Sequence, residues 1–154
     1  MSAQATDVSV NQATKDLFKI AKNPEEMLIL GEKKLKKYIK SIGLFNSKAK
    51  NIIKLSKILC KIYKSKIPKS FEELISLPGV GNKTASVFQN VALKLPRIAV
   101  DTHVFRVANR TGMVKANNPD LTQLWLEKLV PKKWLLNAHN LMILHGRYIC
   151  KSQK

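Results

Sequence analysis

Hydrophobic residues recur along most of this chain at the three- and four-residue spacing of an amphipathic helix. Over residues 47–63 the apolar stripe is Ile52, Leu55, Leu59 and Ile62, and most of the lysines between them fall off that stripe. The short run at residues 97–100 is predicted to be an extended link, because no second β segment is present to pair with it. The pattern therefore predicts an all-α protein.

Capping residues, prolines and glycines mark where these helices begin and end. The expected caps are, in chain order, Asp7 or Ser9, Asn23, Asn46 or Ser47, Ser70, Asn82, and Asp101 or Thr102. The helices are expected at about 7–22, 24–30, 32–41, 47–63, from 71, 83–94, 102–111, 121–130 and 133–149. Gly31 and Gly43 close two of them, and Leu95-Pro96 is a possible seam between a lobe over 1–95 and a second lobe over 96–154.

Length and composition bound the class of protein. A chain of 154 residues is expected to form one domain or two small lobes, and at 45% hydrophobic residues it can bury a core without disulfides. Two cysteines, Cys60 and Cys150, are too few for a disulfide scaffold. No apolar run approaches the length of a membrane span, and the first residues lack the features of a secretion signal. We therefore expect a soluble, cytoplasmic protein with no membrane partner.

The positive charge is concentrated in one part of the chain. The net charge is +18, and residues 33–70 carry thirteen lysines and no acidic residue. Such a block repels itself unless an anionic partner is near. Nucleic acid is the obvious partner, because neutralising phosphates requires clustered cations and little specific sequence. A solvated lysine-rich surface accounts for the charge equally well, so charge alone leaves the two interpretations about even.

The segment at residues 70–83, SFEELISLPGVGNK, is the most informative for chemistry. It predicts two helices joined by a tight Gly79-Val80-Gly81 turn, which would present backbone N–H groups at the start of the second helix. These donors and the positive end of the helix dipole attract phosphate. Glycine permits close approach and a positive φ at such a turn. A helix–turn–helix corner without a ligand remains open at this point.

Two longer runs remove much of that ambiguity. LPGVGNKTA at 77–85 and AVDTHVFRVANRTG at 99–112 resemble the endonuclease III family of helix-hairpin-helix (HhH-GPD) DNA glycosylases. The resemblance continues, in the same order, through SAQATDVSVNQAT at 2–14, IGLFNSKAKNI at 42–52 and LMILHGRY at 141–148. It implies an all-α helix-hairpin-helix fold with its hairpin at about 71–94. It also implies a monomeric, nucleoid-associated base excision repair enzyme that acts on double-stranded DNA with damaged pyrimidines or AP sites.

The resemblance also assigns catalytic residues. Lys83 stands at the position of the nucleophile, whose neutral amine would attack C1′ of the damaged nucleotide and form a Schiff base. β-Elimination would then cut the strand 3′ to the AP site. Asp101 matches the catalytic aspartate, which assists proton transfer and stabilises the cationic sugar, and it can also cap the following helix. His103 is given no chemical role.

DNA-binding residues follow from the same resemblance. The hairpin residues Gly79, Val80 and Gly81 would contact phosphate. A base stacked in duplex DNA cannot reach Lys83, so the nucleotide must be flipped out. Gln4 would fill the vacated space, and Leu44 would wedge in from the opposite strand, because amide and apolar side chains fill space without needing a charged partner.

The chain departs from the family at both ends. Family members carry additional helical sequence before SAQATD, and they end in a C-x6-C-x2-C-x5-C loop that binds a [4Fe–4S] cluster. Cys150 stands at the first ligand position, and the other three are absent from this sequence. Because four thiolates hold such a cluster, we expect no cofactor in this chain, which looks truncated. The second lobe is then incomplete and is expected to expose Leu141, Ile143 and Leu144.

Two functions remain to be compared. The first is a bifunctional DNA glycosylase and AP lyase that removes oxidised pyrimidines. The second is a non-catalytic remnant that uses the hairpin only to bind phosphate, and it predicts salt-sensitive binding that ignores lesions. A monofunctional glycosylase of the adenine-specific branch lacks a lysine at this position, so Lys83 argues against it. The paired motifs also disfavour a generic RNA-binding protein.

Overall fold

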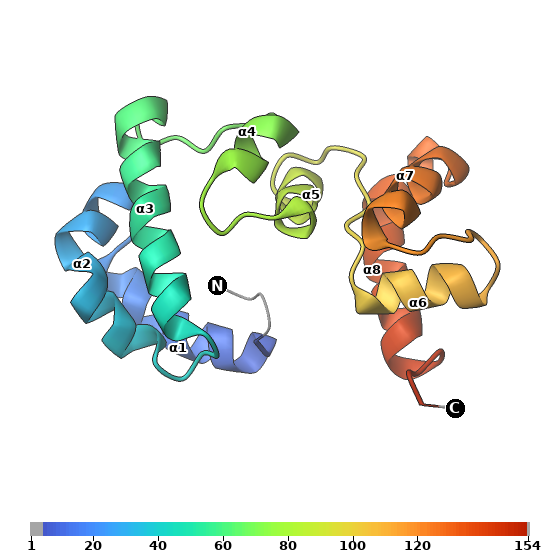
Figure 1. The fold of residues 1–154 in the computed structure, drawn as a ribbon, viewed down its shortest axis with the longest axis horizontal. Helices are drawn as coiled ribbons and strands as arrows, with labels where there is room; N and C mark the ends of the chain where they lie inside the picture. Colours follow the sequence, from blue (N-terminus) through green and yellow to red (C-terminus); the bar gives the residue numbers. More distant parts are fainter. Residues whose placement is uncertain (1–4, 154) are drawn as a thin grey trace. The chain divides into compact units, whose positions relative to one another are not determined.

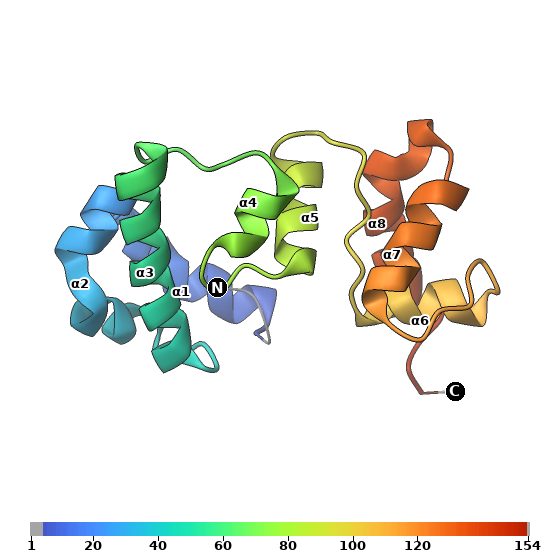
Figure 2. The same ribbon diagram turned by 45° about the horizontal axis from the view of Figure 1, so that its top comes forward.

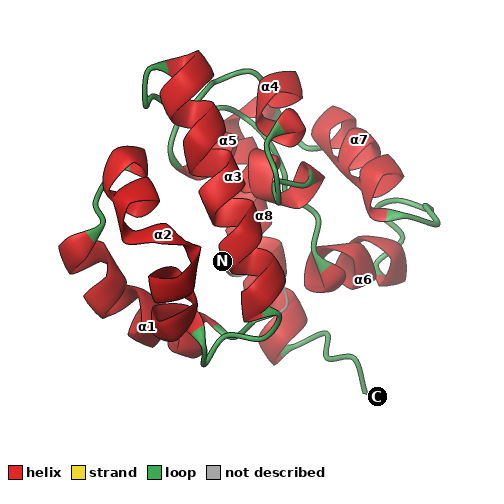
Figure 3. Cartoon of the chain, turned by 60° about the vertical axis from the view of Figure 1, so that its left-hand side comes forward, coloured by secondary structure: helices red, strands yellow, loops and turns green. Residues whose placement is uncertain are grey.

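The computed structural model describes residues 5–153, and these residues form eight α-helices and no strand (Figures 1 and 3). The helices are α1 (Asp7–Ile20), α2 (Pro24–Ile39), α3 (Phe45–Tyr63), α4 (Phe71–Ser76), α5 (Asn82–Val91), α6 (Thr102–Arg110), α7 (Pro119–Leu129) and α8 (Lys132–Tyr148). The all-α prediction is confirmed, and residues 97–100 are a link that belongs to no helix or strand, as expected. No helix in this part of the chain is both long and apolar enough to cross a membrane.

The described residues divide into two compact units. Unit 1 comprises the chain up to Pro68 together with Ser76–Gly79, and unit 2 comprises Lys69–Ile75 and the residues from Val80 onward. The boundary predicted near residue 95 falls inside unit 2. A division into lobes at that position stays a prediction.

Unit 1 is built around helices α1, α2 and α3. Helix α2 packs against both of the others (Figure 1). The core consists of Ala13, Leu17, Ala21, Met27, Leu35, Ile39, Ile42 and Ala49. Gly31, at φ 74°, interrupts α2 where the sequence predicted a helix end. The predicted stripe on α3 buries Leu59 but leaves Ile62, in the last turn of the helix, 68% exposed.

Three predicted caps are confirmed. Asn23, Ser70 and Asp101 each accept a backbone hydrogen bond from the first turn of the helix that follows. Acidic residues follow Asn23 and Ser70 in the first turn of their helices, and an apolar turn follows Asp101. These neighbours make the three cap positions predictable from the sequence.

Three other predicted caps are displaced by one to three residues. Thr6, and not Asp7 or Ser9, caps α1 by accepting from the Ser9 N–H at 3.3 Å. Helix α3 begins after Leu44, which has a left-handed backbone (φ 59°) and makes no side-chain cap, so Asn46 and Ser47 lie inside the helix. Gly81 caps α5, and Asn82 is its first helical residue. In each case several neighbouring residues could cap, and the turn before the helix decides between them.

Unit 2 is built around α6, α7 and α8. Its core consists of Ile98, Val100, Val104, Val107, Ala108, Val114, Leu126, Leu135, Ala138 and Met142. Helix α6 packs closely against α8 (Figure 2). The two helices are so near at Gly146 that a Cβ there would lie only 2.9 Å from Cβ of His103. As predicted, Leu141 and Leu144 are exposed, whereas Ile143 is partly buried against the core.

Candidate active site

Lys83 and Asp101 face one another in unit 2. Lys83 is the second residue of α5, and Asp101 immediately precedes α6. Lys83 Nζ lies 3.6 Å from Asp101 Oδ2. The lysine side chain is 56% exposed and the aspartate side chain only 12%. The pair therefore combines an amine that a large substrate can reach with a carboxylate that is shielded from water.

The two oxygens of Asp101 have different partners. Oδ1 accepts hydrogen bonds from the N–H groups of His103 and Val104, both at 2.9 Å. Oδ2 is the oxygen that faces Lys83. Capping α6 thus fixes the carboxylate and leaves one oxygen directed at the amine, so the two roles expected of Asp101 are compatible in one geometry.

The start of α5 is open on the side of its free N–H groups. The helix has no side-chain cap and no acidic residue in its first turn. Gly81 has an extended backbone, and no atom lies within 4 Å of the place where its Cβ would be. The positive end of the helix dipole and this open backbone suit the close approach of an anion.

Glycine is favoured at position 79 for a different reason than at position 81. Its φ of 79° lies in the left-handed region, and a Cβ there would lie 3.1 Å from Cβ and Nδ2 of Asn51. The positive φ strains any residue other than glycine, and a Cβ would also require the Asn51 side chain to shift. Val80, between the two glycines, is half-buried. A phosphate contact of the three hairpin residues stays a prediction.

Of the two residues assigned to base flipping, Leu44 lies among the described residues. Leu44 is 61% exposed and has a left-handed backbone, which costs a non-glycine residue about 1–3 kcal/mol. An exposed apolar side chain on a strained turn fits a wedge, and that role stays a prediction. Gln4 lies outside the described residues.

The described residues do not fit the family's [4Fe–4S] cluster. Cys60 and Cys150 are both free thiols, and residues 5–153 contain no group of three or more His, Cys, Asp or Glu side chains that could hold a metal ion. Around Cys150, Arg106 Nε donates to the cysteine carbonyl at 3.0 Å and Arg110 Nη1 contacts Sγ at 3.8 Å. The absence of a cofactor from this chain stays a prediction.

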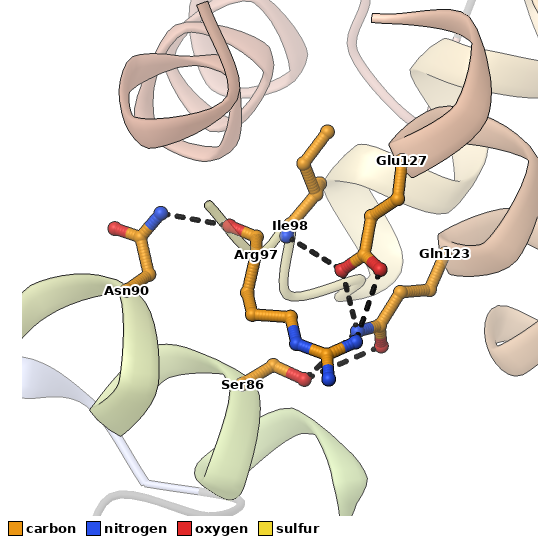
Figure 4. A network of polar contacts seen from close by, with 6 residues as sticks. All are labelled: Ser86, Asn90, Arg97, Ile98, Gln123 and Glu127. Atoms are coloured by element: carbon orange, nitrogen blue, oxygen red, sulfur yellow. Dashed lines mark hydrogen bonds and ion pairs between the residues drawn. The ribbon is translucent and has the colours of Figure 1, made fainter. Parts of the chain in front are cut away.

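Sequence analysis missed the side chains that hold the link before Asp101. Asn90, Glu127 and His139 each hydrogen-bond to its backbone. Two of them are drawn in Figure 4. Only their polarity on otherwise apolar helix faces could have singled them out, and that signal does not name a partner.

Comparisons with known proteins identify the family of this chain. The family model described as "HhH-GPD superfamily base excision DNA repair protein" matches residues 1–132. Endonuclease III of Rickettsia conorii (strain Malish 7) is 58% identical over 154 residues, which are all of this chain and 73% of the relative. Endonuclease III of Escherichia coli (strain K12) is 49% identical with the same coverage of both chains.

Solved structures give the same result. A trapped endonuclease III–DNA covalent intermediate (estranged-adenine complex) matches with a TM-score of 0.94 and 42% identity, over 99% of this chain and 72% of that chain. A thermostable thymine-DNA glycosylase matches with a TM-score of 0.83 and 26% identity, over 98% of this chain and 71% of that chain. This chain therefore belongs to the endonuclease III branch of the HhH-GPD superfamily of base excision DNA repair proteins.

Proposed function

We propose that this chain removes oxidised pyrimidines from DNA and cleaves the strand 3′ to the resulting AP site, through a Schiff base on Lys83. Membership of the family makes it a DNA glycosylase of base excision repair. The observation that carries the proposed chemistry is the exposed Lys83 amine, 3.6 Å from the shielded Asp101 carboxylate.

The proposed reaction uses these two side chains. Neutral Lys83 Nζ attacks C1′ of the damaged nucleotide, and the base leaves with the electron pair of the glycosidic bond and takes up a proton. The sugar ring opens to an imine with Nζ, C2′ then loses a proton to water as β-elimination expels the 3′ phosphate, and hydrolysis of the imine releases Lys83. Asp101 Oδ2, 3.6 Å from Nζ, accepts a proton from Nζ and stabilises the positive charge that develops on the sugar.

The covalent step has a direct test with the wild-type protein. Borohydride added to a mixture of protein and AP-site duplex reduces the imine, so we expect a stable adduct. After proteolysis, mass spectrometry is expected to find the sugar remnant on the peptide that contains Lys83. An undamaged duplex serves as the control and gives no adduct.

The other outcomes are informative. An adduct on a different lysine would show that the nucleophile is assigned wrongly. Binding to the AP-site duplex without any adduct would favour the non-catalytic DNA-binding remnant. Cleavage of a duplex with an oxidised pyrimidine, and not of the matched undamaged duplex, tests the substrate class separately from the lyase step.

Unit 1 is proposed to supply lesion-independent affinity for DNA. Four lysines lie along one side of α3 at spacings of three and four residues, and a fifth follows at its end: Lys50, Lys54, Lys57, Lys61 and Lys64. They are exposed, roughly 5 Å apart along the axis at about 1.5 Å of rise per residue. None of the five forms an ion pair within the described residues. We call this set the α3 lysine row.

Neutralising part of the α3 lysine row is expected to weaken binding to undamaged duplex. In the variant, Lys54, Lys57 and Lys61 are changed to glutamine. The plot of log Kobs against log salt is expected to become less steep by up to about 3, because each phosphate that the protein no longer neutralises removes about 0.9 from the magnitude of the negative slope. The measurement is a salt titration of duplex binding by fluorescence anisotropy.

The matched control for the row removes the same charge elsewhere. Lys128, Lys132 and Lys133 in unit 2 are changed to glutamine, which also lowers the net charge by three. An equal change of slope in both variants would show that total charge, and not the row, determines the affinity. Adduct formation at saturating protein is expected to be unchanged in the row variant.

Two further properties belong to the proposal. The protein is proposed to act as a cytoplasmic, nucleoid-associated monomer. The proposed reaction requires only side chains of this chain, so it is expected to proceed without a [4Fe–4S] cluster.

A further inference from the structure

The link at residues 97–100, which leads directly into Asp101, is buried although it pairs with no strand. Ile98 and Ala99 are fully buried, and Val100 is 6% exposed. Buried backbone N–H and C=O groups require hydrogen-bond partners, which sheets and helices normally provide. In this link, side chains provide the partners of three backbone groups, and the Arg97 N–H donates to the Leu95 carbonyl at 2.8 Å.

Three successive residues of the link are each held by a different helix. Asn90 Nδ2, from α5, donates to the Arg97 carbonyl at 2.7 Å. The Ile98 N–H donates to Glu127 Oε1, from α7, at 3.0 Å (Figure 4). His139 Nδ1, from α8, lies 2.7 Å from the Ala99 carbonyl oxygen.

The protonation of His139 follows from its surroundings. A carbonyl oxygen only accepts hydrogen bonds, so Nδ1 of His139 carries a proton and donates it to Ala99. Burial lowers the pKa of His139 below its ordinary value, although the bond to Ala99 acts in the opposite direction. The ring is therefore neutral at pH 7 and holds the carbonyl through a single tautomer.

Two of the three side chains are themselves fixed by further contacts. Asn90 is buried and also donates to the Leu136 carbonyl at 3.3 Å, which joins α5 to α8. The Glu127 carboxylate accepts from Arg97 Nη1 at 3.2 Å and from Gln123 Nε2 at 2.9 Å. Gln123 in turn contacts buried Ser86 of α5, as Figure 4 shows. The contacts form a connected network across α5, α7 and α8.

This network joins the elements that carry Lys83 and Asp101. Asn90 and Lys83 belong to the same helix, seven residues apart, and Asn90 holds the link only four residues before Asp101. We infer that Asn90, Glu127 and His139 are positioning residues that set the separation between Lys83 and Asp101. A displacement of about 1 Å in such a pair is enough to slow a reaction about 100-fold.

His139 gives the sharpest test, because it contacts the link through one atom. His139→Leu removes the donor to Ala99, and His139→Asn keeps a donor near the position of Nδ1. This inference rests on the function proposed above. Because the link loses the hydrogen bond that holds Ala99, we expect single-turnover cleavage of AP-site duplex to be about 10- to 100-fold slower in the leucine variant than in the wild type. The asparagine variant is expected to recover most of the wild-type rate. Duplex affinity is expected to stay within about threefold, because His139 is buried and cannot touch DNA.

A matched variant separates positioning from loss of stability. Thr122 is fully buried in α7, and its hydroxyl donates to the carbonyl of Asn118, the residue that caps the same helix. Thr122→Val therefore also removes a buried hydrogen bond, but not one made to the link. Thr122→Val is expected to lower Tm and leave the cleavage rate unchanged. A leucine variant at position 139 that cleaves at the wild-type rate, or an asparagine variant that is as slow as the leucine variant, would overturn the inference.

A second measurement does not depend on the proposed chemistry. Amide hydrogen exchange of the peptide that spans residues 97–101 reports directly on whether the link is held. We expect faster exchange there in His139→Leu and not in Thr122→Val. Loss of protection without any wild-type adduct would reject the proposed function and keep the network, whereas unchanged protection would reject the network itself.

Discussion

Changing Lys83 to glutamine is expected to abolish the borohydride-trapped adduct and to slow cleavage of AP-site duplex by roughly 10³-fold or more, as loss of a nucleophile does in other enzymes. Glutamine keeps much of the length of lysine but has no basic amine to attack C1′. Because Lys83 is 56% exposed and follows an unstrained cap at Gly81, the variant is expected to unfold at nearly the wild-type temperature. Gel analysis of the trapped complex and of the cleaved strand measures both effects.

A second lysine serves as the control for Lys83. Lys115 is exposed in unit 2 and makes no ion pair within the described residues. Lys115→Gln therefore removes the same charge but leaves Lys83 and Asp101 unchanged. It is expected to retain the adduct. Equal adduct yields from Lys83→Gln and wild type would remove Lys83 from the mechanism.

Asparagine at position 101 is expected to separate the two roles of Asp101. The amide oxygen of asparagine can still accept from the His103 and Val104 N–H groups, since asparagine caps helices as well as aspartate does. The negative charge beside Lys83 is removed. We therefore expect cleavage to slow by about 10²- to 10⁴-fold, with little change in the thermal unfolding temperature.

Alanine at position 101 completes the comparison. Asp101→Ala removes the cap as well as the charge, which costs about 1 kcal/mol and lowers Tm by about 2–4 °C in a protein of this size. Its cleavage rate is expected to match that of the asparagine variant. If Asp101→Asn kept the wild-type rate and only Asp101→Ala were slow, Asp101 would be a helix cap alone.

The sequence predicts the helices well because their signals are local. Asp101 precedes an apolar turn, Asn23 precedes proline and two acids, and each caps its helix as expected. The start of α3 was misplaced because Leu44 enters it in a left-handed conformation. Leucine carries no preference for that conformation, so no local signal in the sequence marks it.

The candidate site shows a similar division. The pairing of Lys83 with Asp101 follows from family resemblance, because nothing local connects residues eighteen positions apart. The hydrogen bonds of Glu127 and His139 could not be predicted, since their partners are backbone groups of the link, 29 and 40 residues away. A polar residue on a helix indicates a need for a partner, and the tertiary fold selects which one.

The link before Asp101 also bears on the order of folding. Two of its three side-chain partners are 29 and 40 residues away, so most of the bonds that fix the link are non-local. It becomes fixed only after α5, α7 and α8 have docked. The Lys83–Asp101 pair is therefore assembled late, and it comes apart early when unit 2 loosens. In mild denaturant we therefore expect cleavage of AP-site duplex to be lost before the helical circular dichroism signal falls.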